Sequence, residues 1–176
     1  MAVWNGDGMS QEELMLKDEC ILLDLEDNVV GHDNKYESHI FCPSRPRAKL
    51  HRAFSVFLFD DEGRLMLQQR AASKITFPSV WTNTCCSHPL FGFSPSEVDT
   101  AADVASGKVP GVKRAAIRKL KHELGIEAGQ LPHDDFQFIT RLHYWAADVV
   151  THGPAAPFGE HEIDYILLIK AKVDAK

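Results

Sequence analysis

Two glutamates near the end of the chain, Glu160 and Glu162, are separated by a single residue and precede an apolar run. In an extended strand, residues i and i+2 point to the same side, so both carboxylates can reach one point. Three of the nine histidines, His39, His51 and His88, lie in polar connections or at an expected strand end. Three imidazoles and two carboxylates would form a nitrogen and oxygen site for a divalent metal. The alternative is that both glutamates are solvated charges at a strand end.

Cys86 is a second candidate for chemistry. It stands two residues before His88, in an irregular polar stretch over residues 81–89. Beside a metal ligand, the pKa of a thiol can be tuned for proton transfer or for nucleophilic attack. The alternative is an inert, buried, small apolar side chain, which is the usual state of a free cysteine.

The elements that must position these residues follow from sequence periodicity. Ser10 and Glu13 form a capping-box pattern that predicts a helix over residues 10–17. Apolar side chains recur on one face of a helix expected over residues 112–124, and Gly125 stands where such a helix ends. Strands are expected at residues 20–25, 29–31, 51–60, 64–70, 136–145 and 163–173.

A short acidic turn joins the third and fourth of these strands into a predicted β-hairpin. Polar segments separate the other elements: residues 31–49 form a long irregular connection, residues 94–109 a surface insertion and residues 151–159 a loop. Strands with one strongly amphipathic helix indicate an α/β fold, a sandwich of a mixed β-sheet and flanking helices. Residues 10–176 then form a single domain, after a disordered or tag-derived start at residues 1–9.

Composition excludes several classes of protein. The 176 residues are 44% hydrophobic and 25% charged, as in an ordinary folded domain. The formal net charge of −6 argues against a nucleic-acid partner, because nucleic-acid binding surfaces are basic. No apolar run is long enough to span a membrane, and no signal peptide is visible. Four cysteines are too few for a secreted disulfide scaffold. A reducing compartment is therefore expected, either the cytoplasm or a plastid after removal of a transit peptide.

The expected helix over residues 112–124 carries a recognisable motif. Residues 118–126, RKLKHELGI, resemble the signature helix of the Nudix superfamily, in which an arginine and three glutamates hold magnesium on a diphosphate. Arg118 and Glu123 match this signature. Lys119 and His122 stand at the positions of the other two glutamates.

Further motifs extend a family resemblance from about residue 19 to residue 173. They are DECIL at residues 18–22, VGHDNKY at 30–36, HRAFS at 51–55, QQR at 68–70, WTNTCCSHP at 81–89, TRLHY at 140–144 and GEHEIDY at 159–165. With these motifs and the departures in the signature helix, the chain closely resembles the type I isopentenyl diphosphate isomerases, which share the Nudix fold.

The resemblance implies a set of site residues. The implied ligands of a divalent metal, Zn²⁺ or Mn²⁺, are His39, His51, His88, Glu160 and Glu162. A second ion, Mg²⁺, would be held by Glu123 against the substrate diphosphate. The implied catalytic residues are Cys86 on one face of the substrate and Glu162, near Tyr144, on the other. The residues implied to bind the diphosphate are Lys35, Arg70, Lys74 and Lys119.

The implied activity is isomerisation of isopentenyl diphosphate to dimethylallyl diphosphate by protonation and deprotonation on opposite faces. The partner is then a small-molecule diphosphate. In this family the fold continues past the strand expected at residues 163–173 with helices that close over the substrate, and the chain is expected to lack them. Two alternatives remain: a Nudix-type diphosphate hydrolase, and a metal-stabilised binding module without catalysis.

Overall fold

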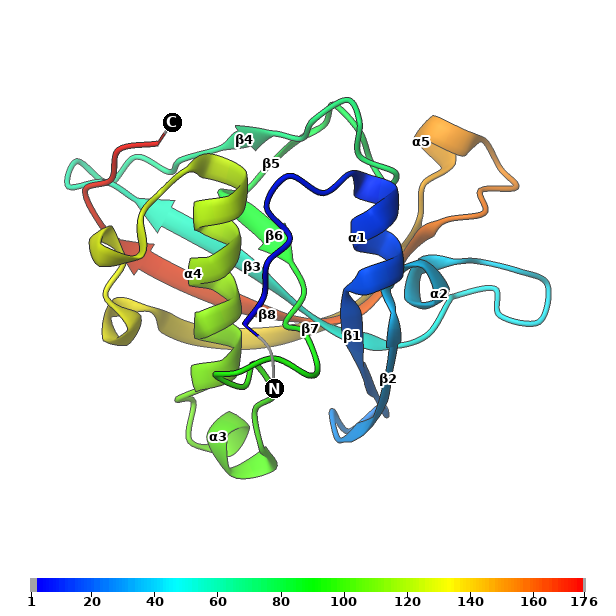
Figure 1. Cartoon of the computed structure of the whole chain (residues 1–176), viewed down its shortest axis with the longest axis horizontal. Helices are drawn as coiled ribbons and strands as arrows, with labels where there is room; N and C mark the ends of the chain where they lie inside the picture. Colours follow the sequence, from blue (N-terminus) through cyan, green and yellow to red (C-terminus); the bar gives the residue numbers. More distant parts are fainter. Residues whose placement is uncertain (1–2, 176) are drawn as a thin grey trace.

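A mixed six-stranded β-sheet forms the centre of the protein (Figure 1). The computed structural model describes residues 3–175, and the strand order is β2-β1-β3-β8-β7, with β6 beside β3. Strand β3 pairs in parallel with β8 and the other pairs are antiparallel, which confirms the predicted α/β class with a mixed sheet. The strands are β1 (Glu19–Leu23), β2 (Val29–Asn34), β3 (His51–Phe59), β6 (Cys85–Ser87), β7 (Gln137–Ala147) and β8 (Gly159–Lys170).

One long helix and several short ones accompany the sheet. Helix α1 begins as predicted: the hydroxyl of Ser10 accepts a hydrogen bond from the amide of Glu13 (3.2 Å), and the Glu13 carboxylate accepts one from the amide of Ser10 (2.7 Å). Among residues 3–175, no helix has the length and apolar character needed to cross a membrane. The helices are α1 (Gln11–Lys17), α2 (Lys35–His39), α3 (Ala101–Ala105), α4 (Pro110–Leu124), α5 (Val149–His152) and two 3₁₀ turns, Ala128–Gln130 and His133–Asp135.

Helix α4 covers one face of the sheet and builds the core (Figure 1). Its side chains Val112 and Leu120 are fully buried in a cluster with Val56 and Leu167 of the sheet. Burial of one side chain of this size contributes about 1.5–3 kcal/mol. Gly125 ends the helix in the left-handed conformation, with a φ of 66°, which glycine adopts without strain. The predicted helix and its end are both confirmed.

The predicted hairpin is only half correct. Its first arm is β3, but the second arm, residues 64–70, leaves the sheet after a single bridge between Phe59 and Leu65. Strand β4 (Gln68–Gln69) pairs instead with β5 (Trp81–Thr82) in a separate two-stranded sheet. The reason is that β3 already has β8 along one edge and β6 and β1 along the other. Local alternation cannot reveal these long-range pairings.

The connection expected to be irregular, residues 31–49, has defined structure over its first half. It completes β2 and then forms α2. The Asn34 side chain caps this helix by accepting a hydrogen bond from the amide of Glu37 at 2.8 Å, which satisfies one of the free donors at the helix start. His39 is consequently the last residue of a helix rather than part of an irregular loop.

The segment at residues 94–109, expected to be a surface insertion, is anchored to the core. It contains α3 and two buried carboxylates, Glu97 and Asp99. The Asp99 carboxylate accepts hydrogen bonds from the amides of Gly111 (2.6 Å) and Val112 (3.0 Å), and so caps the start of α4. A Cβ atom at position 111 would lie 2.5 Å from the backbone oxygen of Glu97, so this close approach requires glycine.

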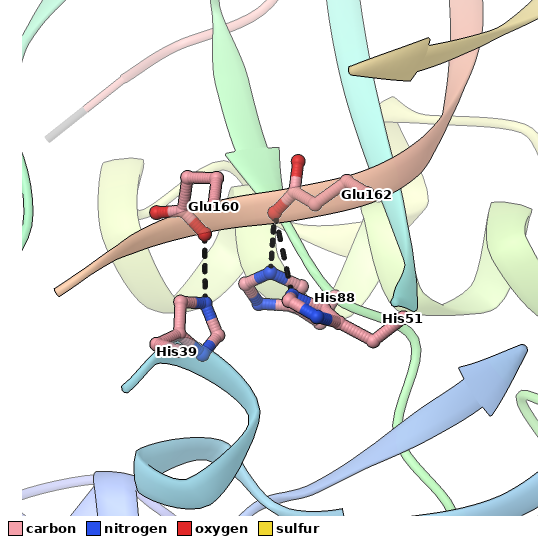
Figure 2. Close-up of side chains that lie close together, drawn as sticks. All are labelled: His39, His51, His88, Glu160 and Glu162. Atoms are coloured by element: carbon pink, nitrogen blue, oxygen red, sulfur yellow. Dashed lines mark hydrogen bonds and ion pairs between the residues drawn. The ribbon is translucent and has the colours of Figure 1, made fainter. Parts of the chain in front are cut away.

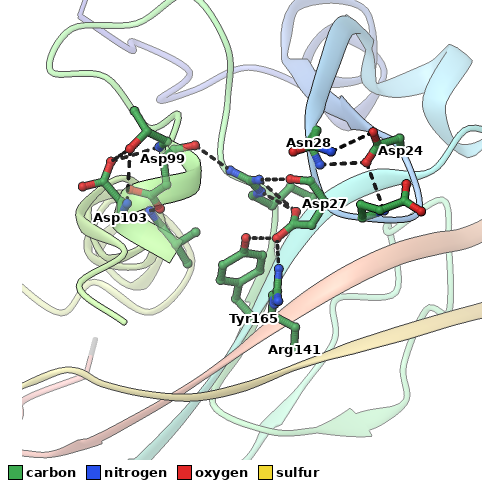
Figure 3. Close-up of polar contacts among 11 residues, drawn as sticks. Asp24, Asp27, Asn28, Asp99, Asp103, Arg141 and Tyr165 are labelled. Atoms are coloured by element: carbon green, nitrogen blue, oxygen red, sulfur yellow. Dashed lines mark hydrogen bonds and ion pairs between the residues drawn. The ribbon is translucent and has the colours of Figure 1, made fainter. Parts of the chain in front are cut away.

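A buried ionic network lies on the face of the sheet that α4 covers (Figure 3). Asp27, in the turn between β1 and β2, accepts hydrogen bonds from Arg52 (2.8 Å) and Arg141 (2.6 Å). The hydroxyl of Tyr165 also donates to this carboxylate, and Arg52 donates further to the backbone oxygen of Asp99 (3.2 Å). We call these five residues the Asp27 network. They join the β1–β2 turn, β3, β7, β8 and the segment before α4.

The sequence predicts a disordered start over residues 1–9, of which residues 1 and 2 lie outside the described residues. Further along this segment, the indole of Trp4 donates a hydrogen bond to the Asp18 carboxylate at 3.0 Å. The same ring stands edge-on to the ring of His122, with 5.0 Å between the centroids. Trp4 therefore contacts both the residue that follows α1 and a residue of α4.

Candidate active site and metal centre

Five polar side chains converge on one point beside β8 (Figure 2). One ligand atom from each lies within 4.8 Å of the ligand atoms of the others. Nε2 of His39 lies 2.8 Å from Oε2 of Glu160. Oε1 of Glu162 lies 2.8 Å from Nε2 of His88 and 3.6 Å from Nε2 of His51. The structure thus brings together all five residues implied as metal ligands, and we call them the His–Glu cluster.

Strand geometry explains why the cluster forms. Glu160 and Glu162 alternate along β8, so both carboxylates project from the same face. His51 is the direct neighbour of Glu162 in the parallel register of β3 and β8. His88 follows β6, which pairs with β3, and His39 ends α2. Segments far apart in the sequence therefore meet because the sheet orders them.

The imidazoles of His39 and His51 are oriented as metal ligands. Nδ1 of His39 donates to the backbone oxygen of Lys35 (2.6 Å), and Nδ1 of His51 donates to that of Lys49 (2.8 Å). In these tautomers, Nε2 of each ring carries a lone pair. Within the described chain, Nε2 of His39, Nε2 of His51 and Oε2 of Glu160 are buried without a hydrogen-bond partner. Buried, unpaired acceptors around one point fit a divalent cation.

The pKa shifts of His88, Glu160 and Glu162 favour the forms that bind a metal. Burial alone would lower the pKa of His51, but the neighbouring Glu162 outweighs it and raises this pKa. Burial, together with the positive charge of Lys35, lowers the pKa of His88 well below its ordinary value, so this imidazole is neutral. Burial alone would raise the pKa of Glu162, but the nearby imidazole of His51 and a hydrogen bond from Tyr144 outweigh it and hold this pKa below its ordinary value. A neutral imidazole and an ionised carboxylate are the protonation states of metal ligands.

The two adjacent cysteines have different surroundings. Cys85 is fully buried in the core, whereas Cys86 lines a pocket together with His88. The Cys86 sulfur lies 2.8 Å from Oδ1 of Asn83 and 3.5 Å from Oγ1 of Thr82. Burial raises the pKa of the Cys86 thiol above its ordinary value. The thiol therefore keeps its proton at neutral pH and can donate it to a molecule in the pocket.

Sequence reasoning missed several neighbours of Cys86. The Asn83 amide nitrogen donates to two backbone oxygens, at 2.9 and 3.1 Å, which fixes its carbonyl oxygen toward the thiol. Oγ of Ser55 lies 3.7 Å from the thiol and donates to Asp164 at 2.8 Å. Burial and the nearby Glu162 raise the pKa of Asp164 to about 7. Position 164 continues the alternation of Glu160 and Glu162, and this signal could have identified it.

Tyr144 connects the edge strand β7 to the cluster. It is the direct neighbour of Glu162 in the register of β7 and β8, and its hydroxyl donates to Oε2 of Glu162 at 2.5 Å. Burial and the negative charge of Glu162 raise the pKa of Tyr144. The phenol therefore remains a hydrogen-bond donor throughout the neutral pH range.

A pocket of about 240 Å³ lies beside the His–Glu cluster. Cys86 and Glu162 both line it. Three of the four basic side chains implied to bind the diphosphate, Lys35, Arg70 and Lys74, line it as well. The fourth, Lys119, is not among the lining residues. The pocket therefore combines positive charge, which attracts an anion, with a proton-carrying thiol and an ionised carboxylate.

Glu123, the implied magnesium ligand, forms ion pairs with two lysines. Its Oε1 lies 2.9 Å from Nζ of Lys74 and 3.1 Å from Nζ of Lys119. Burial alone would raise the pKa of Glu123, but these two lysines hold it well below the usual range. Glu123 also lines the pocket. Its carboxylate is therefore ionised, and it contacts both lysines and faces the pocket.

Arg118, which matches the Nudix signature, makes contacts within the protein. Its guanidinium donates to the Glu97 carboxylate at 2.6 and 2.8 Å and to the backbone oxygen of His88 at 3.1 Å. Arg118 therefore connects the segment over residues 94–109 to the loop that carries a ligand of the cluster.

Comparison with known proteins identifies the domain. A family model described as a NUDIX domain matches residues 49–176, a range that includes four residues of the His–Glu cluster and begins after His39. A crystal structure of a protein from Deinococcus radiodurans has a TM-score of 0.54 with 14% sequence identity. The match covers 90% of this chain and 75% of that chain, and it supports the fold.

Curated relatives share much more of the sequence. An isopentenyl-diphosphate delta-isomerase of Gibberella zeae is 51% identical over 168 residues, which cover 95% of this chain and 62% of the relative. Its counterpart in Schizosaccharomyces pombe is 48% identical over 165 residues, 93% of this chain and 67% of the relative. A chloroplastic isopentenyl-diphosphate delta-isomerase of Arabidopsis thaliana is 48% identical over 159 residues, 90% of this chain and 51% of the relative. The chain thus spans between about half and two thirds of the length of these relatives.

Proposed function

The chain belongs to the NUDIX family and, within it, to the isopentenyl-diphosphate delta-isomerases, and from this premise we propose that it converts isopentenyl diphosphate into dimethylallyl diphosphate. One observation carries the proposal: a protonated thiol, Cys86, and an ionised carboxylate, Glu162, line a single pocket with basic side chains. The basic side chains hold the diphosphate, while the acid and the base act on the alkene.

The reaction consists of two proton transfers. Cys86 donates its thiol proton to the terminal alkene carbon, which leaves a thiolate and a tertiary cation at the adjacent carbon. Glu162 takes a proton from the methylene group on the other side of that cation, and the electrons of the broken C–H bond form the new double bond. Proton exchange with water then restores the thiol and the carboxylate. Groups held at fixed positions make each transfer nearly unimolecular.

Tyr144 and the His–Glu cluster position the base. The Tyr144 hydroxyl binds one oxygen of Glu162 at 2.5 Å, and His88 lies 2.8 Å from the other oxygen. A divalent cation bound in the cluster would hold the same carboxylate and balance its charge, and imidazole and carboxylate ligands suit Zn²⁺ and Mn²⁺ alike. Tyr144 and His88 thereby limit the motion of the base.

The substrate diphosphate binds among the basic side chains in this proposal. Lys35, Arg70 and Lys74 supply positive charge from the pocket wall. Mg²⁺ commonly binds through one or two carboxylates together with substrate phosphates, so Glu123 could hold it against the diphosphate. The ammonium group of Lys74, now 2.9 Å from Glu123, is within the pocket and can exchange its carboxylate partner for phosphate oxygens.

A Nudix-type hydrolase is the main alternative, and the residues around Glu123 disfavour it. The resemblance implies a signature with three glutamates, and Lys119 and His122 stand at two of these positions. Lys119 brings a positive charge to 3.1 Å from Glu123, where the signature has a further carboxylate for metal binding. A binding module without catalysis would leave the protonated thiol of Cys86 without a role.

Incubation with isopentenyl diphosphate in heavy water separates the three functions. The isomerase is expected to produce dimethylallyl diphosphate with deuterium in a methyl group, detected by NMR. Release of phosphate or of the monophosphate would instead support the hydrolase. Retention of metal without turnover of the substrate would support the binding module.

The proposed compartment is one that keeps thiols reduced. All four cysteines, Cys20, Cys42, Cys85 and Cys86, are free. A free thiol at Cys86 is also what the proposed protonation requires. The cytoplasm and the interior of a plastid both meet this condition, and fractionation of the source cells would distinguish them.

A further inference from the structure

The loop between β4 and β5, residues 70–80, carries two of the basic side chains that line the pocket. Arg70 fixes the shape of this loop from within. Its guanidinium donates to the backbone oxygen of Phe77 (2.9 Å) and to that of Thr76 (2.7 Å). Backbone hydrogen bonds close the base of the loop, from the amide of Arg70 to the oxygen of Val80 (2.9 Å) and from the amide of Ser79 to the oxygen of Arg70 (3.1 Å). A diphosphate bound by Arg70 and Lys74 would therefore contact a loop with a defined conformation.

The Thr76 side chain connects this loop to the His–Glu cluster. Thr76 is only 8% exposed, and its hydroxyl donates to Oε1 of Glu160 at 3.0 Å. The other carboxylate oxygen, Oε2, faces His39 at 2.8 Å. Each oxygen of Glu160 thus has its own neighbour, so the hydroxyl of Thr76 fixes the rotation of the carboxylate and turns Oε2 toward the other ligands.

Two further contacts hold the loop against the end of the sheet. The amide of Phe77 donates to the fully buried Asp148 carboxylate at 2.8 Å, and Nε2 of His152 lies 3.3 Å from the backbone oxygen of Ile75. Asp148 and His152 belong to the segment between β7 and β8. The Thr76 hydroxyl therefore reaches Glu160 from a loop that is hydrogen-bonded at its base and also to the segment between β7 and β8.

We propose that Thr76 is a positioning residue for Glu160 and that it couples the diphosphate-binding loop to the metal affinity of the His–Glu cluster. This inference rests on the proposed function, because it requires that the cluster bind a divalent metal. A hydrogen bond to a metal-binding carboxylate orients the ligand, and loss of such a partner typically weakens metal binding about 10- to 100-fold. A coupling of this kind is reciprocal, so a bound metal also holds the loop in place.

The direct test is competition for Zn²⁺ between the protein and a chelator. Thr76→Val keeps the shape of the side chain but lacks the hydroxyl, and it should bind Zn²⁺ about 10-fold more weakly than the wild type. Thr76→Ser keeps the hydroxyl and should restore most of the affinity. Thr100→Val is the matched control, because it removes the hydroxyl that caps α3 and should leave the affinity for Zn²⁺ unchanged.

Hydrogen–deuterium exchange tests the coupling itself. Addition of Zn²⁺ should slow exchange of the amides over residues 70–80 in the wild type and in Thr76→Ser. The same addition should have much less effect in Thr76→Val. This readout distinguishes a coupling role from a purely local loss of stability, which would speed exchange in Thr76→Val with or without the metal.

The outcomes separate this inference from the proposed function. If the wild-type chain binds no divalent metal, the metal centre and this inference both fail. If the wild type and Thr76→Val bind Zn²⁺ equally well, only the role of Thr76 is overturned. An affinity in Thr76→Ser as weak as in Thr76→Val would also overturn it, since the hydroxyl would then not be the cause.

Discussion

The His–Glu cluster and the Asp27 network lie on opposite faces of the same strands, and both are buried and polar. His51 and Arg52 are consecutive residues of β3 and belong to different clusters. In the Asp27 network, one carboxylate receives hydrogen bonds from two guanidinium groups and a phenol (Figure 3). In the His–Glu cluster, acceptor atoms face one another, as Nε2 of His39 and Oε2 of Glu160 do at 2.8 Å (Figure 2).

The difference lies in the balance of donors and acceptors. A buried polar group without a partner costs roughly 1–3 kcal/mol, so a stable fold keeps such groups only where something else satisfies them. The donors of Arg52 and Arg141 match the acceptors of Asp27, and that network needs no ligand. In the His–Glu cluster, Nε2 of His39, Nε2 of His51 and Oε2 of Glu160 are buried without a hydrogen-bond partner, and a divalent cation would satisfy them. The Asp27 network is therefore structural, and the His–Glu cluster is the proposed metal-binding site.

The largest expected effect contrasts the two adjacent cysteines. Cys86→Ala should lower isomerase turnover by about 10⁴-fold, the upper end of what a general acid contributes. Cys85→Ala removes a buried side chain of the core and should leave most of the turnover. Both variants are compared by steady-state rates at saturating substrate. Equal loss in the two variants, or activity that survives Cys86→Ala, would contradict the assignment of the acid.

The next effect separates the base from its neighbouring ligands. Glu162→Gln should reduce turnover about 10³-fold, because an amide cannot take a proton at neutral pH. His51→Ala removes a metal ligand and should cause the greater loss of bound metal, as measured by elemental analysis of the purified proteins. If both variants lose metal equally and activity follows metal content, then Glu162 is a ligand only.

The third prediction concerns the Asp27 network. Asp27→Asn leaves the buried Arg52 without its counter-charge, and such a change typically destabilises a protein by about 3–5 kcal/mol. The free energy of unfolding, measured with urea, should fall by this amount. Metal bound per folded chain should stay at the wild-type level. Loss of metal at unchanged stability would remove the distinction between the two clusters.

The smallest effect is expected at Glu123, whose carboxylate forms ion pairs with Lys74 and Lys119 and also lines the pocket. Its pKa is lower in the folded chain than the ordinary value of 4.5, so the ionised carboxylate stabilises the fold above about pH 4.5. That stabilisation is lost as the pH falls toward the folded-state pKa. Glu123→Gln should therefore be less stable than the wild type near pH 7, by about 2 kcal/mol. Urea unfolding at several pH values measures the difference in free energy of unfolding between the wild type and Glu123→Gln. This difference should become smaller below about pH 4.5, and a difference that does not change with pH would contradict the role of the ion pairs.

Local sequence patterns predicted the parts of the site that depend on local geometry. The alternation of Glu160 and Glu162 follows from strand geometry alone, and the end of α4 at Gly125 follows from a local cap. The three histidines and Cys86 were candidates from their positions in polar segments and at an expected strand end, and the family resemblance implied their roles. Neither source predicted that β4 would pair with β5, because pairing depends on which strand edges are already occupied.

The missed contacts share a physical reason. Thr76 reaches Glu160 across 84 positions in the sequence, and Ser55 reaches Asp164 across 109. No periodicity connects residues so far apart, and the tertiary fold alone brings them together. The anchoring of the largely exposed segment over residues 94–109 was missed for the same reason, since Asp99 caps a helix that begins 11 positions later.

Titration of metal into chelator-stripped protein tests the central claim most directly. With Mg²⁺ and isopentenyl diphosphate both saturating, isomerisation is followed as Zn²⁺ or Mn²⁺ is added in fractions of an equivalent per chain. We expect negligible turnover in the stripped protein and a linear rise that stops at about one equivalent, since the five converging ligands form a single site. The same titration of His51→Ala should produce little activity. Full turnover in the stripped wild type, or a rise that is unaffected by His51→Ala, would contradict the assignment of the His–Glu cluster as the metal centre.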